Sequence, residues 1–295
     1  MVAAIFGIGA LVLFAATEKA TPPSLRKAHL YPVEGRAIVR TVKHVNVAGW
    51  LFVLLVTLLV ETGVRAFDYE QKIATPSSTL RALYDALADG TLSGEIGFTL
   101  HAYLEGLALA ILVGVTVGLL IGSSRTLLDA SSVVIEFLRP IPAVALIPLA
   151  ILFFCPFGIA AHRFVVVFAA VWPILINTIY GVRGGDRMLQ DVARTSGVGR
   201  VGRLFHVTLP AALPSIATGI RVSAAIALVV CVTAEFRTGA GGIGDYMKDQ
   251  QFANKLPKLY AAVVLVSLLG LAVNAGLRAV QRRTLFWAGE ERSAQ

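Results

Sequence analysis

A basic stretch, residues 191–210, separates two long apolar segments and carries Arg194, Arg200, Arg203 and His206. Such side chains cannot rest in lipid, so the stretch needs an aqueous or a protein partner. Its two halves, DVARTS and RVGRLFHV, are compatible with helix, with Gly197 at the join and Pro210 expected to stop the second half. The chemistry that this pattern indicates is docking, because two short helices about a glycine turn form a knob that fits a groove on another protein.

A second candidate is the apolar segment LRPIPAVALIPLAILFF (138–154), in which Arg139 is followed by Pro140, Pro142 and Pro148. Each proline removes a backbone donor and kinks or breaks a helix, which frees carbonyl groups that must be satisfied inside the protein or by water. Broken helices in transporters often mark the solute pathway. Two interpretations stay open: a pathway or gate formed by Arg139 and these prolines, and a structural kink at the cytoplasmic end of the span.

Two further charged residues belong to apolar segments. Glu235 ends the run ALVVCVTA, where it can reach the interface, pair with Arg237, or contact a partner or solute. Pairing or a structural role is favoured over a role in transport, and the following GAGGIGDY (239–246) is expected to be a tight re-entrant turn or a flexible loop. Arg221 lies one or two turns into its span, where a single arginine most often extends to the cytoplasmic surface.

The sequence lacks the common motifs for hydrolytic catalysis, metal binding and nucleotide binding. It contains no GxSxG, no HExxH and no GxxxxGK(S/T), so the chain is not expected to hydrolyse ATP through a P-loop. The five histidines show no close metal spacing, and Cys155 and Cys231 are expected to be small buried hydrophobes. We therefore expect no catalytic residue and no metal, and no cofactor bound by this chain.

The composition is that of an integral membrane protein. Of 295 residues, 56% are hydrophobic and 15% are charged, whereas soluble proteins carry roughly 25% charged residues. The net charge of +8 could suggest a nucleic-acid partner. The basic residues gather instead in short loops that would face the cytoplasm, as the positive-inside rule predicts, so no nucleic acid is expected.

The order of apolar and polar segments predicts an all-α fold with about six core transmembrane helices and a possible extra N-terminal helix. The spans are expected at about 47–66, 98–122, 132–154, 163–182, 213–236 and 258–279. Residues 47–287 form the predicted transmembrane domain, with a cytoplasmic loop at 183–212. Around it lie an apolar segment (1–16) that spans or lies in the interface, a basic cytoplasmic linker (17–46) and a cytoplasmic tail (288–295).

Two local patterns add detail to this arrangement. Residues 79–90, TLRALYDALADG, have the apolar spacing of an amphipathic helix that lies along the outer interface. The span 98–122 repeats small residues every four positions, at Gly106, Ala110, Gly114, Gly118 and Gly122. Such a face lets two helices approach closely, and packing within the chain is favoured over a dimer seam.

The basic stretch resembles the "EAA" loop of ABC importer permeases. The family pattern is E-A-A, three residues, G, nine residues and I-x-L-P. Here Asp191, Val192 and Ala193 fill the first three places, Gly197 the glycine, and Val207-Thr208-Leu209-Pro210 (207–210) the end. Asp191 and Val192 depart from the pattern but keep its acidity and modest size. Arg200 lies inside the same loop.

From about Pro76 to Trp287 the chain is similar to permeases of the nitrate/sulfonate/taurine group of type I ABC importers, most clearly in LRPIP and TLPAALPSIATGIR. The resemblance implies half of a transmembrane pore, with Asp191, Ala193, Gly197, Leu209 and Pro210 in an ATPase-coupling loop. It implies a second permease copy, identical or different, and a cytoplasmic ATPase dimer that holds ATP and Mg²⁺. It also implies an extracytoplasmic binding protein that delivers a small solute. The permease itself is then expected in the cytoplasmic (inner) membrane.

A non-transporting scaffold and a membrane enzyme are the alternatives to this function. A scaffold would have no reason to keep a glycine-hinged helical loop at that spacing. A membrane enzyme should show paired catalytic residues inside the apolar segments, and the sequence has none.

Overall fold

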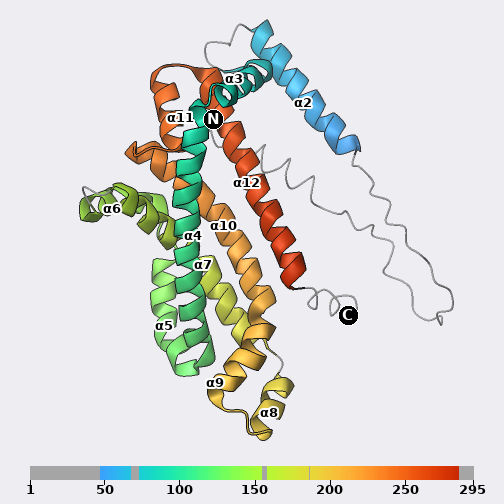
Figure 1. Ribbon diagram of the computed structural model, residues 1–295, viewed down its shortest axis with the longest axis vertical. Coiled ribbons are helices and arrows are strands. Elements are labelled where there is room, and N and C mark those ends of the chain that lie inside the picture. Colours follow the sequence, from blue (N-terminus) through green and yellow to red (C-terminus); the bar gives the residue numbers. More distant parts are fainter. Residues whose placement is uncertain (1–46, 68–72, 155–157, 186, 286–295) are drawn as a thin grey trace, which may run out of the picture. The chain divides into compact units, whose positions relative to one another are not determined.

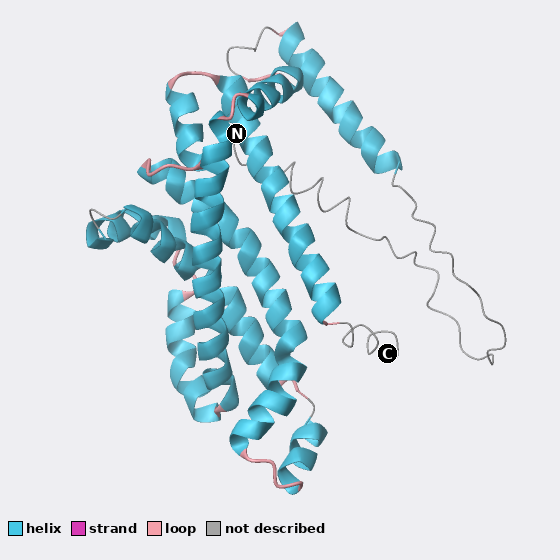
Figure 2. Cartoon of the chain, viewed as in Figure 1, coloured by secondary structure: helices cyan, strands magenta, loops and turns pink. Residues whose placement is uncertain are grey.

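A computed structural model describes residues 47–67, 73–154, 158–185 and 187–285. Every regular element in these ranges is helical, which confirms the predicted all-α fold (Figure 1, Figure 2). The segments predicted at 1–16, 17–46 and 288–295 lie outside the described residues. In chain order the elements are α2 (Val47–Ala66), α3 (Pro76–Ala88), α4 (Thr91–Ser123), α5 (Arg125–Leu138), η2 (Ala143–Leu146), α6 (Ile147–Phe154), α7 (Gly158–Arg183), α8 (Arg187–Thr195), α9 (Arg200–Arg203), η3 (Leu204–Thr208), α10 (Leu209–Thr238), α11 (Ile243–Phe252) and α12 (Leu256–Thr284).

Most of the predicted spans are found as long helices. By length and composition α4, residues 160–183 of α7, the continuous helix 201–238 and α12 can each cross a membrane. Helix α2 coincides with the span predicted at 47–66, and α4 begins seven residues earlier than predicted, at Thr91. The span predicted at 132–154 is instead a broken pair: α5 and the η2–α6 segment meet at 79°.

The described chain forms two compact units that divide the predicted transmembrane domain at Ser78. In the first unit, Glu61 near the end of α2 accepts hydrogen bonds from the backbone N–H of Ser77, at 3.1 Å, and from its hydroxyl, at 2.7 Å. Arg65 completes the cluster with an ion pair to Glu61 at 2.5 Å. These bonds hold the last turns of α2 against the first turn of α3.

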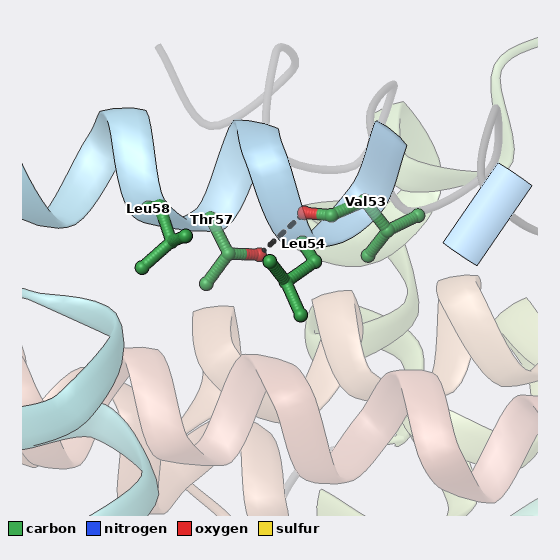
Figure 3. Close-up of a pocket in the computed structure, with 4 residues that line it drawn as sticks. All are labelled: Val53, Leu54, Thr57 and Leu58. Atoms are coloured by element: carbon green, nitrogen blue, oxygen red, sulfur yellow. Dashed lines mark hydrogen bonds between the residues drawn. The ribbon is translucent and has the colours of Figure 1, made fainter. Parts of the chain in front are cut away.

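A shallow pocket on α2 is lined by Val53, Leu54, Thr57 and Leu58 (Figure 3). Its only polar side chain is Thr57, whose hydroxyl donates to the carbonyl of Val53 at 2.8 Å. A small-molecule site needs convergent polar groups to orient its ligand. This pocket, built from one helix, offers none, so it is not a candidate for the solute site.

In the second unit, α4 packs on α7 through its stripe of glycines. A Cβ atom on Gly106 would lie 2.6 Å from a methyl carbon of Val166, and one on Gly118 would lie 2.6 Å from Cβ of Thr178. Gly114 and Gly122 meet Ile174 and Val182 in the same way. The stripe is therefore a helix-packing face within the chain, as predicted, because only glycine leaves room for these β-branched side chains.

The same contacts decide how the broken pair runs. The residue numbers of the contacting pairs increase in the same direction on α4 and α7, from Gly106 with Val166 to Gly122 with Val182. The two helices are therefore parallel. The chain must therefore return along the length of α4 between Ser123 and Gly158. The α5–η2–α6 segment makes that return, which makes it one broken span rather than a loop that re-enters and leaves on the same side.

Helix α10 runs antiparallel to α7 and buries polar groups against it. Gly181 of α7 meets Ser215 near the start of α10, whereas Gly219 lies against Asn177. Farther along, the buried hydroxyl of Ser223 donates to the carbonyl of Ala170 at 2.6 Å. The end of α4, the start of α5 and helices α8 and α9 consequently lie at one end of this unit (Figure 1).

Helix α3 confirms the predicted amphipathic helix at residues 79–90. Its Ala82, Leu83 and Ala86 are buried in the core of the second unit, whereas Leu80 and Tyr84 are largely exposed. Exposed apolar side chains beside a buried face are typical of a helix at a membrane surface. Its location at the outer interface stays a prediction.

Candidate functional site

The loop predicted at 183–212 begins with α8 and a tight turn. The backbone N–H of Val198 donates to the carbonyl of Ala193 at 3.0 Å, and that of Gly197 donates to Arg194 at 3.2 Å. These two bonds form a Schellman motif, which places its C′ residue in the left-handed region. Gly197 occupies that position with φ +76°. The glycine at the join is thus required by the backbone, as the sequence predicted.

The second half of the loop differs from prediction at Pro210. The proline does not end a helix, because α9, η3 and α10 run on without a break from Arg200 to Thr238. Residues 204–208 form a π-helix in which Leu209 donates its N–H to the carbonyl of Leu204. A π turn shifts the hydrogen-bond register by one residue, and Pro210, which lacks a donor, then falls near the start of α10.

Apolar side chains are exposed on both halves of the loop. Met188, Leu189 and Val192 project from α8, whereas Val201 is 70% exposed and Phe205 is 56% exposed. Ala193 is buried and Asp191 is exposed. Arg200 begins α9, and its side chain is not among those described. We call the apolar residues 188, 189, 192, 201 and 205 the loop face. Several large apolar side chains exposed on one loop are typical of a protein-binding surface.

The predicted gate residues lie at the break in the α5–η2–α6 span. Arg139 caps α5, and Pro140 follows it within the turn; both are exposed. Pro142 has an extended backbone, with ψ 114°, and precedes η2. Pro148 is the second residue of α6. Pro140 and Pro142 therefore account for the break, whereas Pro148 fits inside a first helical turn, where no donor is missed.

Glu235 is fully buried, with 0% of its surface exposed. Its side chain does not extend to the membrane interface, and Arg237 is not its partner. Its Oε2 accepts from the hydroxyl of Thr99 at 3.0 Å and from the backbone N–H of Gly244 at 3.0 Å. Thr99 in turn accepts from the N–H of Ile243 at 2.9 Å. The carboxyl group of Glu235 therefore caps the N-terminus of α11, which supports a structural role for Glu235 over a role in transport.

The glycine-rich segment after α10 wraps around this carboxylate as the entry to α11. Gly242 has φ +93°, and a Cβ atom there would lie 2.6 Å from a carboxylate oxygen of Glu235. Its N–H donates to Glu95 of α4 at 2.7 Å. The segment is thus a tight turn, the first of the two predicted forms, and it joins α4, α10 and α11.

The sequence reasoning missed an ion pair between two apolar helices. Arg163 of α7 and Glu105 of α4 meet at 2.5 Å, with side chains 38% and 36% exposed. His101, one turn before Glu105, lies 3.5 Å from the same carboxylate. A charge inside a span is a signal for function or pairing. Two opposite charges in neighbouring spans could have suggested the pair, had the pairing of α4 with α7 been known.

Comparison with known proteins decides the family. Residues 110–286 match the family described as the binding-protein-dependent transport system inner membrane component. This chain belongs to that family. It is a permease subunit of an ABC importer and a multi-pass membrane protein, and it is not itself an enzyme.

Individual relatives agree with the family. A Bacillus subtilis protein assigned as an aliphatic sulfonates transport permease, SsuC, is 30% identical over 73% of this chain and 78% of its own length. The nitrate import permease protein NrtB of Leptolyngbya laminosa is 30% identical over 70% and 77%, respectively. The permease fold recurs in an inward-facing structure of the MetNI methionine ABC transporter. That match has a TM-score of 0.59 and 18% identity and covers 65% of this chain and 95% of the other.

Proposed function

We propose that this permease forms half of the translocation pore of an importer in the cytoplasmic membrane, for a small solute such as a sulfonate, taurine or nitrate. An extracytoplasmic binding protein delivers the solute, and a second permease copy, identical or different, supplies the other half of the pore. The names of the relatives support a sulfonate or nitrate, since they assign aliphatic sulfonates to one relative and nitrate to another.

The observation that carries the coupling role is the continuity of the loop with α10. The loop face exposes apolar side chains at one end of the second unit. Its second half, α9 and η3, runs without interruption into the span that packs on α7. A rigid connection of this kind transmits a displacement of the loop to the membrane, whereas a flexible tether would absorb it.

In this proposal two cytoplasmic ATPases receive the loops of the two permeases. They bind ATP with Mg²⁺, since this chain has no P-loop. When ATP draws the ATPases together, each loop moves and tilts its α10, which switches the pore between inward-open and outward-open. The loaded binding protein biases the same two states from the outside, so ATP and solute are coupled through one equilibrium.

Co-purification tests the proposal. The chain is tagged at its C-terminus, extracted gently and analysed for an ATPase that carries a P-loop. The double variant Leu189→Asp/Val192→Asp should lose that ATPase, because it places charge on the loop face. The control Leu80→Asp/Tyr84→Asp changes exposed apolar residues of α3 and should keep it. An ATPase that stays bound to the loop variant, or a wild-type chain that purifies alone, would contradict the coupling role.

A further inference from the structure

Arg221 is a cation without a partner inside the span α10. It makes no hydrogen bond or ion pair with any residue in the described ranges, and its Nε is buried without an acceptor. The rest of the side chain is half-buried. Arg163, near the start of α7, is by contrast paired with Glu105. Arg221 therefore lacks the compensation that a charge in a membrane protein needs.

The packing of α10 on α7 fixes the depth of Arg221. Two residues before it, Gly219 would place a Cβ atom 3.2 Å from Cα of Ile174; two residues after it, Ser223 bonds to Ala170. Arg221 thus lies level with residues 170–174, at the middle of the apolar stretch from Ala160 to Arg183. About ten residues of helix, roughly 15 Å, separate this level from either end.

This depth excludes the expectation that Arg221 extends to the cytoplasmic surface. Half of a hydrocarbon core about 30 Å thick lies on each side of it, which is more than an arginine side chain can cross. A guanidinium at the midplane is strongly disfavoured when it faces lipid. Arg221 must therefore face water or a group of opposite charge.

No acidic side chain of the helices packed on α10 is described at this level. α7 contains no acidic residue, Glu105 of α4 is paired with Arg163, and Glu235 is enclosed at the α11 end of α10. Among the described residues, therefore, no acidic side chain supplies a counter-charge to Arg221. α10 continues directly into α9 and η3, so Arg221 moves with the loop that the proposed function assigns to ATPase docking.

We propose that Arg221 lines the translocation pathway and contacts an anionic solute there, through its two parallel N–H donors. A planar guanidinium matches the paired oxygens of a sulfonate, nitrate or carboxylate group. An unpaired cation near the midplane lowers the barrier for an anion and raises it for a cation. The inference rests on the proposed function, and it adds the residue that contacts the solute and selects an anion.

Water access to position 221 is the first test. The variant R221C is made in a chain with Cys155→Ser and is treated with a thiosulfonate reagent that carries a sulfonate group. The native Cys231 is fully buried and serves as an internal control. We expect labelling in the nucleotide-free complex or in the complex trapped with ATP and vanadate. Labelling should be at least tenfold faster than in A224C, whose position is buried at nearly the same depth. Equal, slow labelling of R221C and A224C in both states would overturn the proposal.

Uptake is the second test, with the complete importer in liposomes and with nitrate and ethanesulfonate as probes. We expect R221Q to reduce uptake at least tenfold and R221K to keep part of it, with ATPase stimulation by the loaded binding protein within twofold of wild type. The control R282Q removes an exposed arginine from the last turn of α12 and should leave uptake within twofold. Normal uptake by R221Q, or a wild-type importer that carries a neutral solute and neither anion, would overturn the role of Arg221.

Two other outcomes distinguish this inference from a role of Arg221 at a permease–permease interface and from failure of the proposed function. Glu136 is exposed on α5, about 17 Å from the start of that helix, and could pair with Arg221 of a second copy. If R221E dissociates the permease pair and E136R restores it, Arg221 is an interface charge and the proposal fails. If wild type shows no ATP-dependent uptake of any solute, the proposed function fails, whereas labelling of R221C still decides whether the position faces water.

Discussion

The backbone N–H of Leu209 donates to the carbonyl of Leu204, five residues earlier, and this bond joins the second half of the loop, α9 and η3, to the span α10 in one helix. The same helix carries Arg221 at mid-depth and Glu235 at its far end. In the proposed mechanism, a displacement of α9 and η3 is transmitted along α10 to Arg221 and to the turn that leads to α11.

The glycine stripe of α4 gives a prediction about stability. Gly118→Ala places a Cβ atom 2.6 Å from Cβ of Thr178, so it should lower the free energy of unfolding by about 1–3 kcal/mol. The matched control is Gly97→Ala in the same helix, where nothing lies within 4 Å. It should be neutral or stabilising by up to about 1 kcal/mol. Thermal unfolding of the purified chain in detergent measures both, and equal melting temperatures would contradict the packing.

The network around Glu235 predicts a structural rather than a transport defect. Glu235→Gln replaces a carboxyl group that accepts hydrogen bonds from Thr99 and Gly244 with an amide whose nitrogen cannot accept. The loss should destabilise the fold by about 1–3 kcal/mol and leave the KM for uptake unchanged. Asp249→Asn, an exposed change on α11, is the control. A shifted KM with unchanged thermal stability would instead return Glu235 to the pathway.

The ion pair between Glu105 and Arg163 should show measurable coupling in a double-mutant cycle. Either Glu105→Gln or Arg163→Gln alone leaves one charge without its partner, so each single variant should unfold more easily than wild type. The double variant should recover at least half of the combined loss. Because both side chains are partly exposed, we expect a coupling of only about 1 kcal/mol. Additive losses in thermal unfolding would show that the pair is not a stabilising contact.

Local patterns in the sequence predicted what local physics controls. The apolar segments predicted the long helices, the four-residue spacing of glycines predicted their close packing, and Gly197 predicted its turn. The prediction that Pro210 ends a helix was wrong. The π turn before it depends on a shift of the hydrogen-bond register, which residue propensities do not predict.

The remaining features depend on which helices pair. Glu105 and Arg163 are 58 positions apart and meet only because α4 lies parallel to α7. The depth of Arg221 likewise follows from the contact between α10 and α7. The sequence alone places Arg221 one or two turns into the span predicted at 213–236, whereas this contact places it level with residues 170–174 of α7. The bonds of Glu235 to α11 and α4 need three elements to come together.

The most direct test of the account is the ratio of solute uptake to ATP hydrolysis in the reconstituted importer with Gly197→Val. Valine at φ +76° costs at least about 1–2 kcal/mol and deforms the turn between α8 and α9, although no neighbouring atom lies within 4 Å. Gly199→Val is the control, because Gly199 also has open space but no positive φ.

We predict that the Gly197→Val chain still reaches the membrane and hydrolyses ATP with its partner, while uptake per ATP falls at least tenfold; Gly199→Val should keep the wild-type ratio. Wild-type uptake per ATP in the Gly197→Val importer would contradict the claim that this turn couples the ATPase to the pore.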